Sequence, residues 1–401
     1  MKNGNILISG ASIAGPTLAY WLRRYGFNPT VVERAPAPRP GGYKIDIRGV
    51  AVDVVERMGL YDEIRRAGTD MQGGSYVDAT GRWLATIDGE TFGFRSGDDV
   101  EIMRGDLGHI LHEKTRNDVE YVFNDSITSI TQDVHGARVT FERGAPRTFD
   151  LVIGADGLHS NVRALAFGDE ARFAFDLGTY VSIFSVPNHL GLDRWELVCS
   201  KPGRLVGLSS TRGDTQAKAF FTFVAPPLRD GARDPARQKE LLNDVYAGMG
   251  WEVPRLLEAM ADAPDFYFDR MTQIDMDRWS AGRVVLVGDA GYCPSPASGQ
   301  GTSLALVGAY VLAGELAASG GDHHIAFARY EARMRGYVER NQKLGKSAAK
   351  HMTQSHRALI WLQILLMRAL PHMPWRDSII RRALQPIRDA AEAISLPQYA
   401  G

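Results

Sequence analysis

The sequence has few cysteines and no excess of either charge. Only Cys199 and Cys293 occur in 401 residues, and their separation fits neither a metal knuckle nor a redox pair. We therefore expect two free thiols, as in a reducing cytoplasm, which is the compartment we predict. A net charge of −1 argues against nucleic acid as a partner, because binding phosphates needs a strongly basic face.

Long apolar runs are also scarce. Residues 6–22 imitate the core of a signal peptide, but they divide into a strand-like run, a glycine-bearing turn and a helix-like segment, as a nucleotide-binding unit does. The run 358–370 is shorter than the ~20 residues of a membrane span and is interrupted by Gln363 and Arg368. We therefore predict no membrane span, and the overall composition is that of an ordinary globular protein.

The apolar periods predict an α/β chain that opens with a βαβ unit. Strand-like and helix-like runs alternate at 6–9, 13–25, 30–33 and 50–58. The proline-rich link 35–42 cannot be helical, because proline removes a backbone donor and pushes the preceding residue into an extended conformation. After a helix at 106–114, three runs predict a β-meander: 119–123, 126–131 and 137–142.

Strand patterns dominate from residue 175 to 275, with Lys201-Pro202-Gly203 as a hairpin turn. The strand-like runs are 180–186, 195–200, 204–210 and 219–224. A strand at 284–287 and a helix at 302–317 follow, and Pro371 and Pro374 separate helical stretches near the C-terminus. We predict a discontinuous nucleotide-binding domain (1–70, 97–174 and 277–340), an inserted β-sheet domain (71–96 and 175–276) and a bridging helical segment (341–401).

The first glycine-bearing turn, residues 10–15, has the features of a dinucleotide site. Gly10 permits a tight turn, the small Ser12 lets the backbone approach a pyrophosphate, and Gly15 allows close helix packing. Glu33 ends the next strand, 18 residues beyond Gly15, where it can bind ribose hydroxyls. Ser12 replaces the usual middle glycine, so a plain βα turn is the alternative.

Two later segments place an aspartate just after an apolar strand that ends in glycine. Asp156 follows the run 150–154, and Asp289 follows the run 282–288. Strand-end carboxylates face the ligand crevice of a parallel sheet. The alternative for Asp156 is a cap for the helix that begins near Ser160. The loop 294–301 then leads into a helix, with a rigid loop and an N-cap at Thr302 as its structural interpretation.

These three segments, in this order and spacing, resemble the class A flavoprotein monooxygenases, the p-hydroxybenzoate hydroxylase-like family. The Gly-Gly-x-x-Ile-x-Ile stretch at 41–47 is most similar to the tetracycline-inactivating monooxygenases and their actinobacterial relatives. The resemblance covers nearly the whole chain. It implies a Rossmann-like FAD-binding domain of α/β class with an inserted β-sheet substrate domain and C-terminal helices.

The resemblance also implies roles for individual residues. Those that would hold the ADP half of FAD are Gly10, Ser12, Ile13, Ala14, Gly15, Glu33 and Arg34. Those that would lie near the flavin and its ribitol chain are Arg104, Gly288 and Asp289, and Asp156 would serve both FAD and the nicotinamide donor. The flavin-positioning loop would comprise Pro294, Pro296, Gly299, Gly301 and Thr302, whose helix N-terminus stabilises the negative charge of reduced flavin.

The implied activity is hydroxylation of a small, largely apolar, aromatic or polyketide-like substrate. NADPH or NADH and O2 would be consumed, through a flavin hydroperoxide; no side chain is assigned to catalysis and no metal is expected. A reductase or halogenase of the same frame is the enzymatic alternative, although the halogenase segment Trp-x-Trp-x-Ile-Pro is absent. A non-catalytic flavin-binding regulatory protein is the other alternative, and we expect a monomer or homodimer.

Other conspicuous residues have ordinary structural interpretations. Five aromatic residues of the strand-rich part could wall a cavity, but each is expected to be core: Tyr180, Phe184, Trp195, Phe221 and Phe223. Many relatives carry a histidine after Gly-Asp-Ala-Ala, where this chain has Gly291-Tyr292. We expect Tyr292 to pack in the protein interior and assign it no proton transfer. His323 and His324 should diverge at a solvated helix start. The cations Arg333, Arg340, Lys343, Lys346 and Lys350 predict a solvated helical face, and Ile360-Trp361-Leu362 leaves membrane-surface docking as the alternative.

Overall fold

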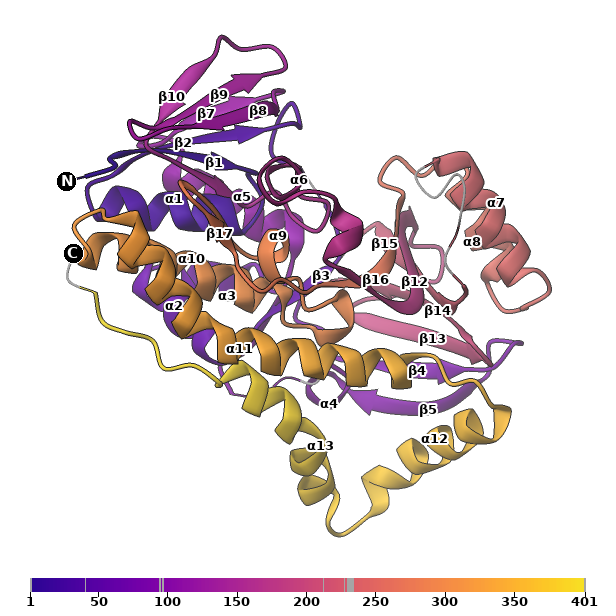
Figure 1. The fold of residues 1–401 in the computed structure, drawn as a ribbon. Coiled ribbons are helices and arrows are strands. Elements are labelled where there is room, and N and C mark those ends of the chain that lie inside the picture. The colour runs from indigo at the N-terminus through magenta and orange to yellow at the C-terminus, as the bar shows by residue number, and fades with distance from the viewer. Residues whose placement is uncertain are drawn as a thin grey trace.

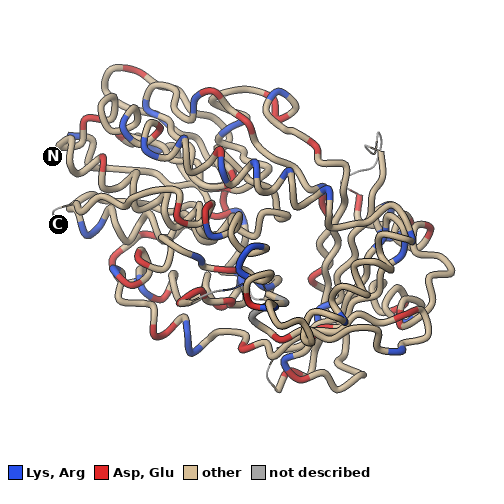
Figure 2. The backbone as a smooth tube through the Cα atoms, turned by 90° about the horizontal axis from the view of Figure 1, so that it is seen from below, with Lys and Arg blue, Asp and Glu red and all other residues tan. Residues whose placement is uncertain are grey.

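The computed structural model describes residues 2–39, 41–93, 95, 97–211, 213–226, 228 and 234–399. Pro40 of the proline-rich link and the predicted domain limits at residues 1, 96 and 401 lie outside this part. Two large sheets dominate, one at each end of the molecule, with helices between and around them (Figure 1). Charged residues of both signs are interspersed over most of the backbone (Figure 2).

The first large sheet has six strands in the order β17-β18-β11-β1-β2-β7. Their bounds are Ser280–Ala281, Val284–Leu286, Leu151–Gly154, Asn5–Ser9, Asn28–Glu33 and Glu120–Phe123. All neighbours are parallel except β17 and β18. Ile6, Leu7 and Ile8 are fully buried, because a parallel sheet is covered on both faces. The predicted βαβ opening is confirmed.

The predicted β-meander is wrong in its first strand. β7 follows the helix α5 (Arg104–Thr115) and pairs in parallel with β2, as a crossover connection allows. Only β8 (Ile127–Gln132), β9 (Ala137–Phe141) and β10 (Arg147–Phe149) form an antiparallel three-stranded sheet. Alternation alone could not reveal this, because a short strand has the same local pattern in either sheet.

Helices pack against the six-stranded sheet and against one another. They include α1 (Ala14–Arg24), α2 (Val50–Arg57), α3 (Tyr61–Arg66), α10 (Gly301–Ala318) and α11 (His323–Met352). α10 contacts α1, α2 and α11. By length and composition α10 could cross a membrane, but 78% of it is buried inside the protein, so core packing explains its apolar sequence. α11 runs from the six-stranded sheet toward the second large sheet and contacts β12 (Figure 1).

The second large sheet has seven strands in the order β16-β12-β15-β14-β13-β4-β5. Their bounds are Tyr267–Ile274, Ala174–Pro187, Gln216–Val224, Arg204–Ser210, Trp195–Lys201, Gly73–Val77 and Trp83–Asp88. The four predicted strands are present, and β4 and β5, which were not predicted, extend the sheet by parallel pairing of β4 with β13. A two-stranded sheet of β3 (Lys44–Ile47) and β6 (Val100–Met103) lies apart from it.

One face of the seven-stranded sheet packs against α7 (Pro235–Tyr246) and α8 (Val253–Met260). The aromatic residues Tyr180, Phe184, Phe221 and Phe223 are buried in this cluster, and Trp195 packs against it. Their interpretation as core is therefore confirmed. Because side chains alternate along a strand, the opposite face carries Phe220, next to Phe221, and Tyr267, which lies between Phe266 and Phe268 of the same cluster.

The remaining helices and 3-10 turns complete the described chain. They are α4 (Gly89–Gly93), α6 (Asn161–Phe167), η1 (Glu170–Arg172), α9 (Asp289–Tyr292), η2 (Pro296–Ser298), α12 (Arg357–Ala369), η3 (Leu370–His372) and α13 (Arg376–Ala391). Pro371 and Pro374 separate α12 from α13, as predicted. Tyr292 packs, as expected, and its hydroxyl lies 2.8 Å from that of Tyr330.

One expectation about the start of α11 is wrong, and the expectation about its cationic face is confirmed. His323 and His324 do not diverge: their ring centroids lie 4.0 Å apart, and burial lowers the pKa of His323 to about 4. Arg333, Arg340, Lys343 and Lys350 are exposed and Lys346 is half-buried, as a solvated helical face requires, and Arg333 also pairs with the buried carboxylate of Glu315. Cys199 and Cys293 are free and buried, in agreement with the sequence.

Candidate functional site

The carboxyl ends of four neighbouring parallel strands bring the predicted residues together. In the order β18-β11-β1-β2, these ends lead to Asp289, Asp156, Gly10 and Glu33. The strand pairing sets this alignment, with Ile8 of β1 opposite Ile153 of β11 and Val31 of β2. Ligands bind at this edge of an open parallel sheet, where the strand order changes direction.

The turn between β1 and α1 is closed by glycines that tolerate no side chain. Gly10 has a φ of +107°, and a Cβ there would lie 2.5 Å from the carbonyl oxygen of Ala155. A Cβ on Gly15 would lie 1.9 Å from the carbonyl oxygen of Gly10. The backbone of the first motif thus touches that of the second. The helix α1 begins just after Ile13, so its free N–H groups point to this edge.

Glu33 links the same turn to the loop after β2. Its two carboxylate oxygens accept hydrogen bonds from the backbone N–H groups of Ala11 and Ala35, each at 2.9 Å. Arg39 lies 3.8 Å from the carboxylate, whereas Arg34 is exposed. A carboxylate fixed at the end of the second strand is positioned to accept from sugar hydroxyls.

Arg104, at the start of α5, reaches across to the first turn. It donates a hydrogen bond to the hydroxyl of Ser12 at 2.7 Å, and its backbone N–H donates to the carbonyl of Tyr43 at 3.0 Å. A Cβ on Gly105 would lie 2.4 Å from the carbonyl oxygen of Gly41. The Gly-Gly stretch therefore packs directly on the helix that carries Arg104.

Asp156 has the capping role that the sequence left open. Its carboxylate accepts from the hydroxyl of Ser160 at 2.5 Å and from the backbone N–H of Val162 at 3.0 Å, at the start of α6. Burial raises the pKa of Asp156, and these hydrogen bonds oppose that shift. A role of this carboxylate toward a nicotinamide donor remains a prediction.

Asp289 and the N-terminus of α10 form the other side of the edge. The Asp289 carboxylate lies beside the first helical residue, since a Cβ on Gly301 would be 3.7 Å from its Oδ1. Burial raises the pKa of Asp289, and Arg104 partly opposes the shift. The preceding loop contains Pro294 and η2, which begins at Pro296, and Gly299 has a φ of +62°. Gln300, not Thr302, is the N-cap, so the cap position in the structural alternative for this loop is wrong.

Several polar residues at this edge were not assigned from the sequence. Lys44 and Asp46 alternate with Ile45 and Ile47 along β3, a pattern typical of a half-buried strand. Lys44 Nζ lies 2.6 Å from Glu196 Oε2 on β13, and Asp46 Oδ2 lies 2.7 Å from Arg48. The alternation of residues 44–47 could have revealed the strand, but its long-range partners could not be predicted.

The described residues fit FAD. Both amide atoms of the fully buried Gln300 and the Oδ1 atom of Asp46 are buried and have no hydrogen-bond partner within the described part of the chain. Buried polar atoms normally have hydrogen-bond partners. A polar ring edge bound near the N-terminus of α10 would supply the missing partners. The side-chain-free turn at Gly10 and Gly15 suits a pyrophosphate, and Glu33 suits a ribose.

The face of the seven-stranded sheet opposite α7 and α8 looks toward this edge. The rings of Tyr43 and Tyr267 lie 6.1 Å apart, and a Cβ on Gly41 would be 3.7 Å from Lys218 Nζ. The ring of Phe220 lies across Gly207, since a Cβ on that glycine would be 2.0 Å from it. This side chain forms a flat apolar surface on the side of the sheet nearest the edge.

His159 connects the second motif to the seven-stranded sheet. Its ring nitrogens lie 3.0 Å from Glu170 Oε1 and 3.0 Å from Asp269 Oδ2 on β16. Hydrogen bonds to Asp269 and Glu170 favour the imidazolium and raise the pKa of His159 to about 9. The link therefore carries a positive charge between two carboxylates at neutral pH.

This link predicts an alkaline loss of stability. A raised pKa stabilises the fold fully below the unfolded value of ~6.5, and the contribution disappears as the pH rises through about 9. His159 is half exposed, so solvent screens the effect. Between these pH values, we expect the melting temperature of the native chain to fall by about 1–2 °C more than that of the variant His159→Gln. Melting curves across the range measure this. His135→Gln is the exposed control, and equal slopes for all three proteins would contradict the prediction.

Comparison with known proteins agrees with this geometry. A protein-family model described as FAD binding domain matches residues 4–340. A flavin-dependent monooxygenase of Legionella longbeachae is 42% identical over 399 residues, covering 99% of each chain. The chain belongs to the FAD-dependent monooxygenases.

Two further similarities are informative. An uncharacterized protein of Mycobacterium tuberculosis is 51% identical over 341 residues, covering 84% of this chain and 92% of that protein. The solved structure of the tetracycline destructase Tet(55) superimposes on this chain with a TM-score of 0.87. The two sequences are 42% identical, and the comparison covers 100% of each chain. The family, the α/β fold with an added sheet, and the use of FAD are those that the three sequence motifs predicted.

Proposed function

We propose that this chain uses NADPH or NADH and O2 to hydroxylate a flat, largely apolar molecule, and that the edge formed by Gly10, Glu33, Arg104 and Asp289 holds its FAD. The observation that carries the proposal is the buried, unsatisfied amide of Gln300 at the N-terminus of α10. FAD, when bound, supplies electron transfer from the nicotinamide to oxygen and oxygen transfer to the substrate. The protein supplies position and a dry environment.

Residues on the two sides of the site would divide the work. The turn at Gly10 and the N-terminus of α1 would accept the pyrophosphate, with Glu33 on the ribose. Gly299, Gly301 and Thr302 would direct backbone N–H groups at the flavin, where a helix N-terminus favours negative charge without any cationic side chain. Asp289 would accept from ribitol hydroxyls. Burial raises the pKa of Asp289 because it removes water from the carboxylate. Hydrogen bonds from ribitol hydroxyls would replace that water and stabilise the ionised form.

The substrate would lie between this edge and the flat surface of Phe220 and Tyr267. Aromatic faces of this kind bind planar apolar molecules, and a few polar groups such as Lys218 fix orientation. The similarity to the tetracycline destructase Tet(55) makes tetracyclines the first compounds to test. Simple phenols and other polycyclic polyketides are the comparison panel.

Anaerobic reduction of the bound flavin tests the proposal. NADPH and NADH are each mixed with the FAD-loaded protein, with and without each compound, and the flavin absorbance is followed. We expect at least one compound to accelerate reduction, and the reduced protein to yield an oxygenated product on admission of O2. Reduction of a carbon–carbon double bond of a substrate, with stable turnover only in the absence of oxygen, would indicate a reductase. Bound FAD that no nicotinamide reduces with any compound in the panel would contradict the proposal and favour a regulatory role.

The flat surface gives a prediction about substrate affinity. In Gly207→Ala the new methyl group would meet the ring of Phe220, which must turn away from the strand. We expect KM for an accepted substrate to rise roughly fivefold to thirtyfold, corresponding to about 1–2 kcal/mol of lost contact, with FAD content unchanged. Steady-state kinetics and the flavin-to-protein ratio measure both. Val224→Ala, on an exposed side chain at the end of β15, is the control. An unchanged KM in Gly207→Ala would place the substrate elsewhere.

A further inference from the structure

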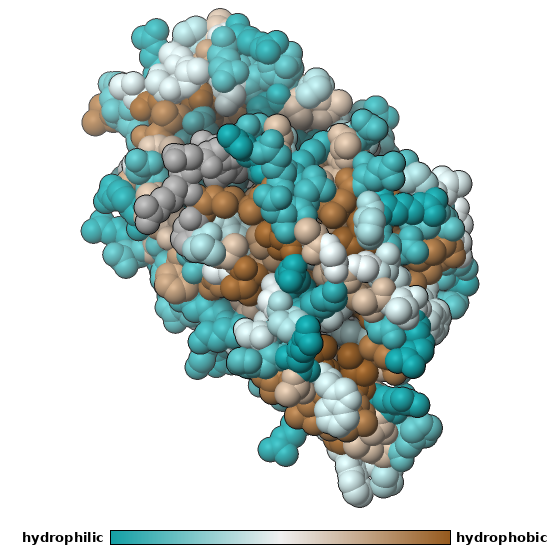
Figure 3. All heavy atoms as spheres, turned by 90° about the vertical axis from the view of Figure 1, so that its right-hand side faces the viewer, coloured by the Kyte–Doolittle hydropathy of each residue, from teal (hydrophilic) through white to brown (hydrophobic). Residues whose placement is uncertain are grey.

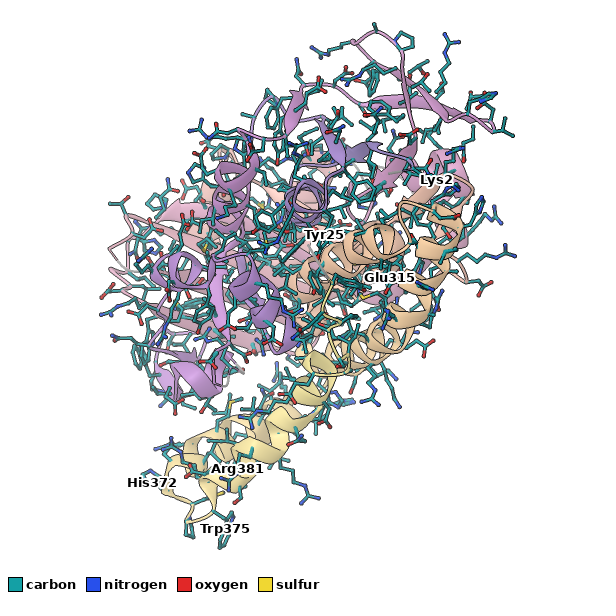
Figure 4. All side chains as sticks on the ribbon, turned by 90° about the vertical axis from the view of Figure 1, so that its left-hand side faces the viewer. Lys2, Tyr25, Glu315, His372, Trp375 and Arg381 are labelled. Carbon is teal, nitrogen blue, oxygen red and sulfur yellow. The ribbon has the colours of Figure 1, made fainter. Side chains whose placement is uncertain are left out.

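The C-terminal hairpin of α12, η3 and α13 projects from the body of the protein. None of the α12 residues, Arg357–Ala369, is buried. The labelled side chains of His372, Trp375 and Arg381 lie at the far end of this hairpin, away from the sheets (Figure 4). A surface helix of a globular protein normally buries one apolar stripe, so the exposure of α12 needs an explanation.

Only one side of α12 faces the protein. Ile360 and Ile364 line a pocket of about 270 Å³ together with residues of β4 and β5 such as Tyr76 and Leu84. Because residues three and four apart share a helix face, Leu359, Leu362 and Leu366 form a stripe on another side. The exposed large apolar residues of the hairpin are Leu359, Trp361, Leu362, Leu365, Leu366, Trp375 and Ile379.

The exposed apolar surface of the hairpin, which includes the stripe, Trp361 at the rim of the pocket and Trp375 before α13, is large for a surface in water. Trp361 is 65% exposed, Trp375 63% and Leu366 53%. Hydrophobic residues gather on the projecting end of the molecule that carries this hairpin (Figure 3). Contiguous exposed apolar surface of this kind marks an interaction site. α12 is apolar on both its inner and its outer side, and only the inner side has a partner within the described residues.

The segment that contains the stripe, between Glu339 and Asp377, carries charge of one sign. Residues 340–376 contain seven cations and no aspartate or glutamate: Arg340, Lys343, Lys346, Lys350, Arg357, Arg368 and Arg376. The remaining residues hold 39 Lys and Arg against 47 Asp and Glu, so the rest of the chain carries −8 while this segment carries +7. Arg376 has an acidic neighbour, Asp88 at 3.3 Å, and Lys346 lies over the ring of Phe175.

We propose that this hairpin docks on an anionic lipid surface, with the leucine stripe of α12 at the boundary between headgroups and acyl chains. Basic residues attract anionic headgroups, exposed leucines enter the acyl boundary, and tryptophan rings favour the interface between them. A second copy of the chain is a poorer occupant, because pairing two such hairpins would bring like charges together. The proposal concerns where the chain works and is independent of its flavin chemistry.

Vesicle sedimentation tests the proposal on the full-length, FAD-loaded protein. Vesicles of equal parts phosphatidylglycerol and phosphatidylcholine are compared with vesicles of phosphatidylcholine alone. We expect binding to the anionic vesicles, little binding to the neutral ones, and weakening by added salt. Leu359→Glu/Leu366→Glu should reduce the partition coefficient more than roughly tenfold, since two leucines leave the lipid and two negative charges approach it.

The matched control places the same charges elsewhere. Val134→Glu/Ile325→Glu changes two exposed apolar residues outside the hairpin and should bind as the native chain does. Melting temperature and FAD content establish that all proteins are folded. Failure of the folded native protein to bind anionic vesicles would overturn the proposal, and so would equal losses in the two double variants. A concentration-dependent dimer that only the hairpin variant abolishes would show that a second copy covers the stripe.

Discussion

Gly15→Ala is expected to be purified with less than about a tenth of the FAD of the native chain and with a lower melting temperature. Alanine in a helix gains up to about 1 kcal/mol over glycine, so propensity alone would favour the variant. The new Cβ would, however, lie 1.9 Å from the carbonyl oxygen of Gly10. Backbone must move to relieve such an overlap, at a cost of about 1–3 kcal/mol, and the part that moves is the turn proposed to hold the pyrophosphate.

Gly108→Ala is the matched control for this prediction. Gly108 also lies within a helix, α5, but a Cβ there would meet no heavy atom within 4 Å. The control should keep its FAD and melt at the same or a slightly higher temperature. The flavin-to-protein absorbance ratio and titration of apoprotein with FAD measure the effect, since a loss of 1.4 kcal/mol is tenfold in affinity. Stoichiometric FAD in Gly15→Ala would contradict the assignment of the turn.

Arg163→Leu is expected to cause the second large loss. The side chain is fully buried and donates to the carbonyl oxygens of Ala290 at 2.9 Å and Leu158 at 2.7 Å. It also lies 2.6 Å from the Glu170 carboxylate. Glu170 is partly exposed and keeps His159 as a partner, so the main loss is that of the donor to two carbonyl groups, at about 1–3 kcal/mol for each group left unsatisfied. Because Ala290 follows Asp289, the loss should extend to FAD affinity.

Two comparisons separate the causes of this effect. Arg163→Lys keeps the charge but cannot reach three acceptors from one planar group, so it should recover only part of the stability. Arg172→Leu removes an exposed arginine nearby and should melt within about 1–2 °C of the native chain. Thermal unfolding with and without added FAD measures both effects. If Arg163→Leu melts as the native chain does, Arg163 does not hold α9 in place.

Local sequence patterns predicted the edge of the six-stranded sheet well. A strand, a glycine turn and a helix are consecutive between residues 5 and 24, and aspartates after apolar strands lie at the carboxyl edge of any parallel sheet. The pairing of distant strands was less accessible. β7 was placed in the wrong sheet, because its partner β2 lies far away in the sequence. Residues 71–96 were assigned to the β-sheet domain, but the strands β4 and β5 within them were not predicted, and the pairing of β4 with the distant β13 could not be.

The site itself divides in the same way. Glycine and acidic residues at strand ends were predicted because their role follows from their position along the chain. The roles of Gln300, Asp46 and Lys44 depend on which side chains the folded chain places around them, and no local pattern carries that information. Similarly, the sequence predicted Tyr180, Phe184, Phe221 and Phe223 one by one to be core, but only the packing of α7 and α8 shows that they share one face of the sheet.

The strand order of the six-stranded sheet has a consequence for how the chain matures. β11 receives its partner β18 from residues 284–286, after the whole seven-stranded sheet has been synthesised. A ribosome adds about 5–20 residues per second, so the backbone edge of β11 that pairs with β18 has no partner for roughly ten seconds as the chain emerges, although its other edge can already pair with β1. Contacts of such long sequence separation form slowly. Flavin capture must therefore be a late event, and chaperones or a lower growth temperature should raise the yield of loaded protein.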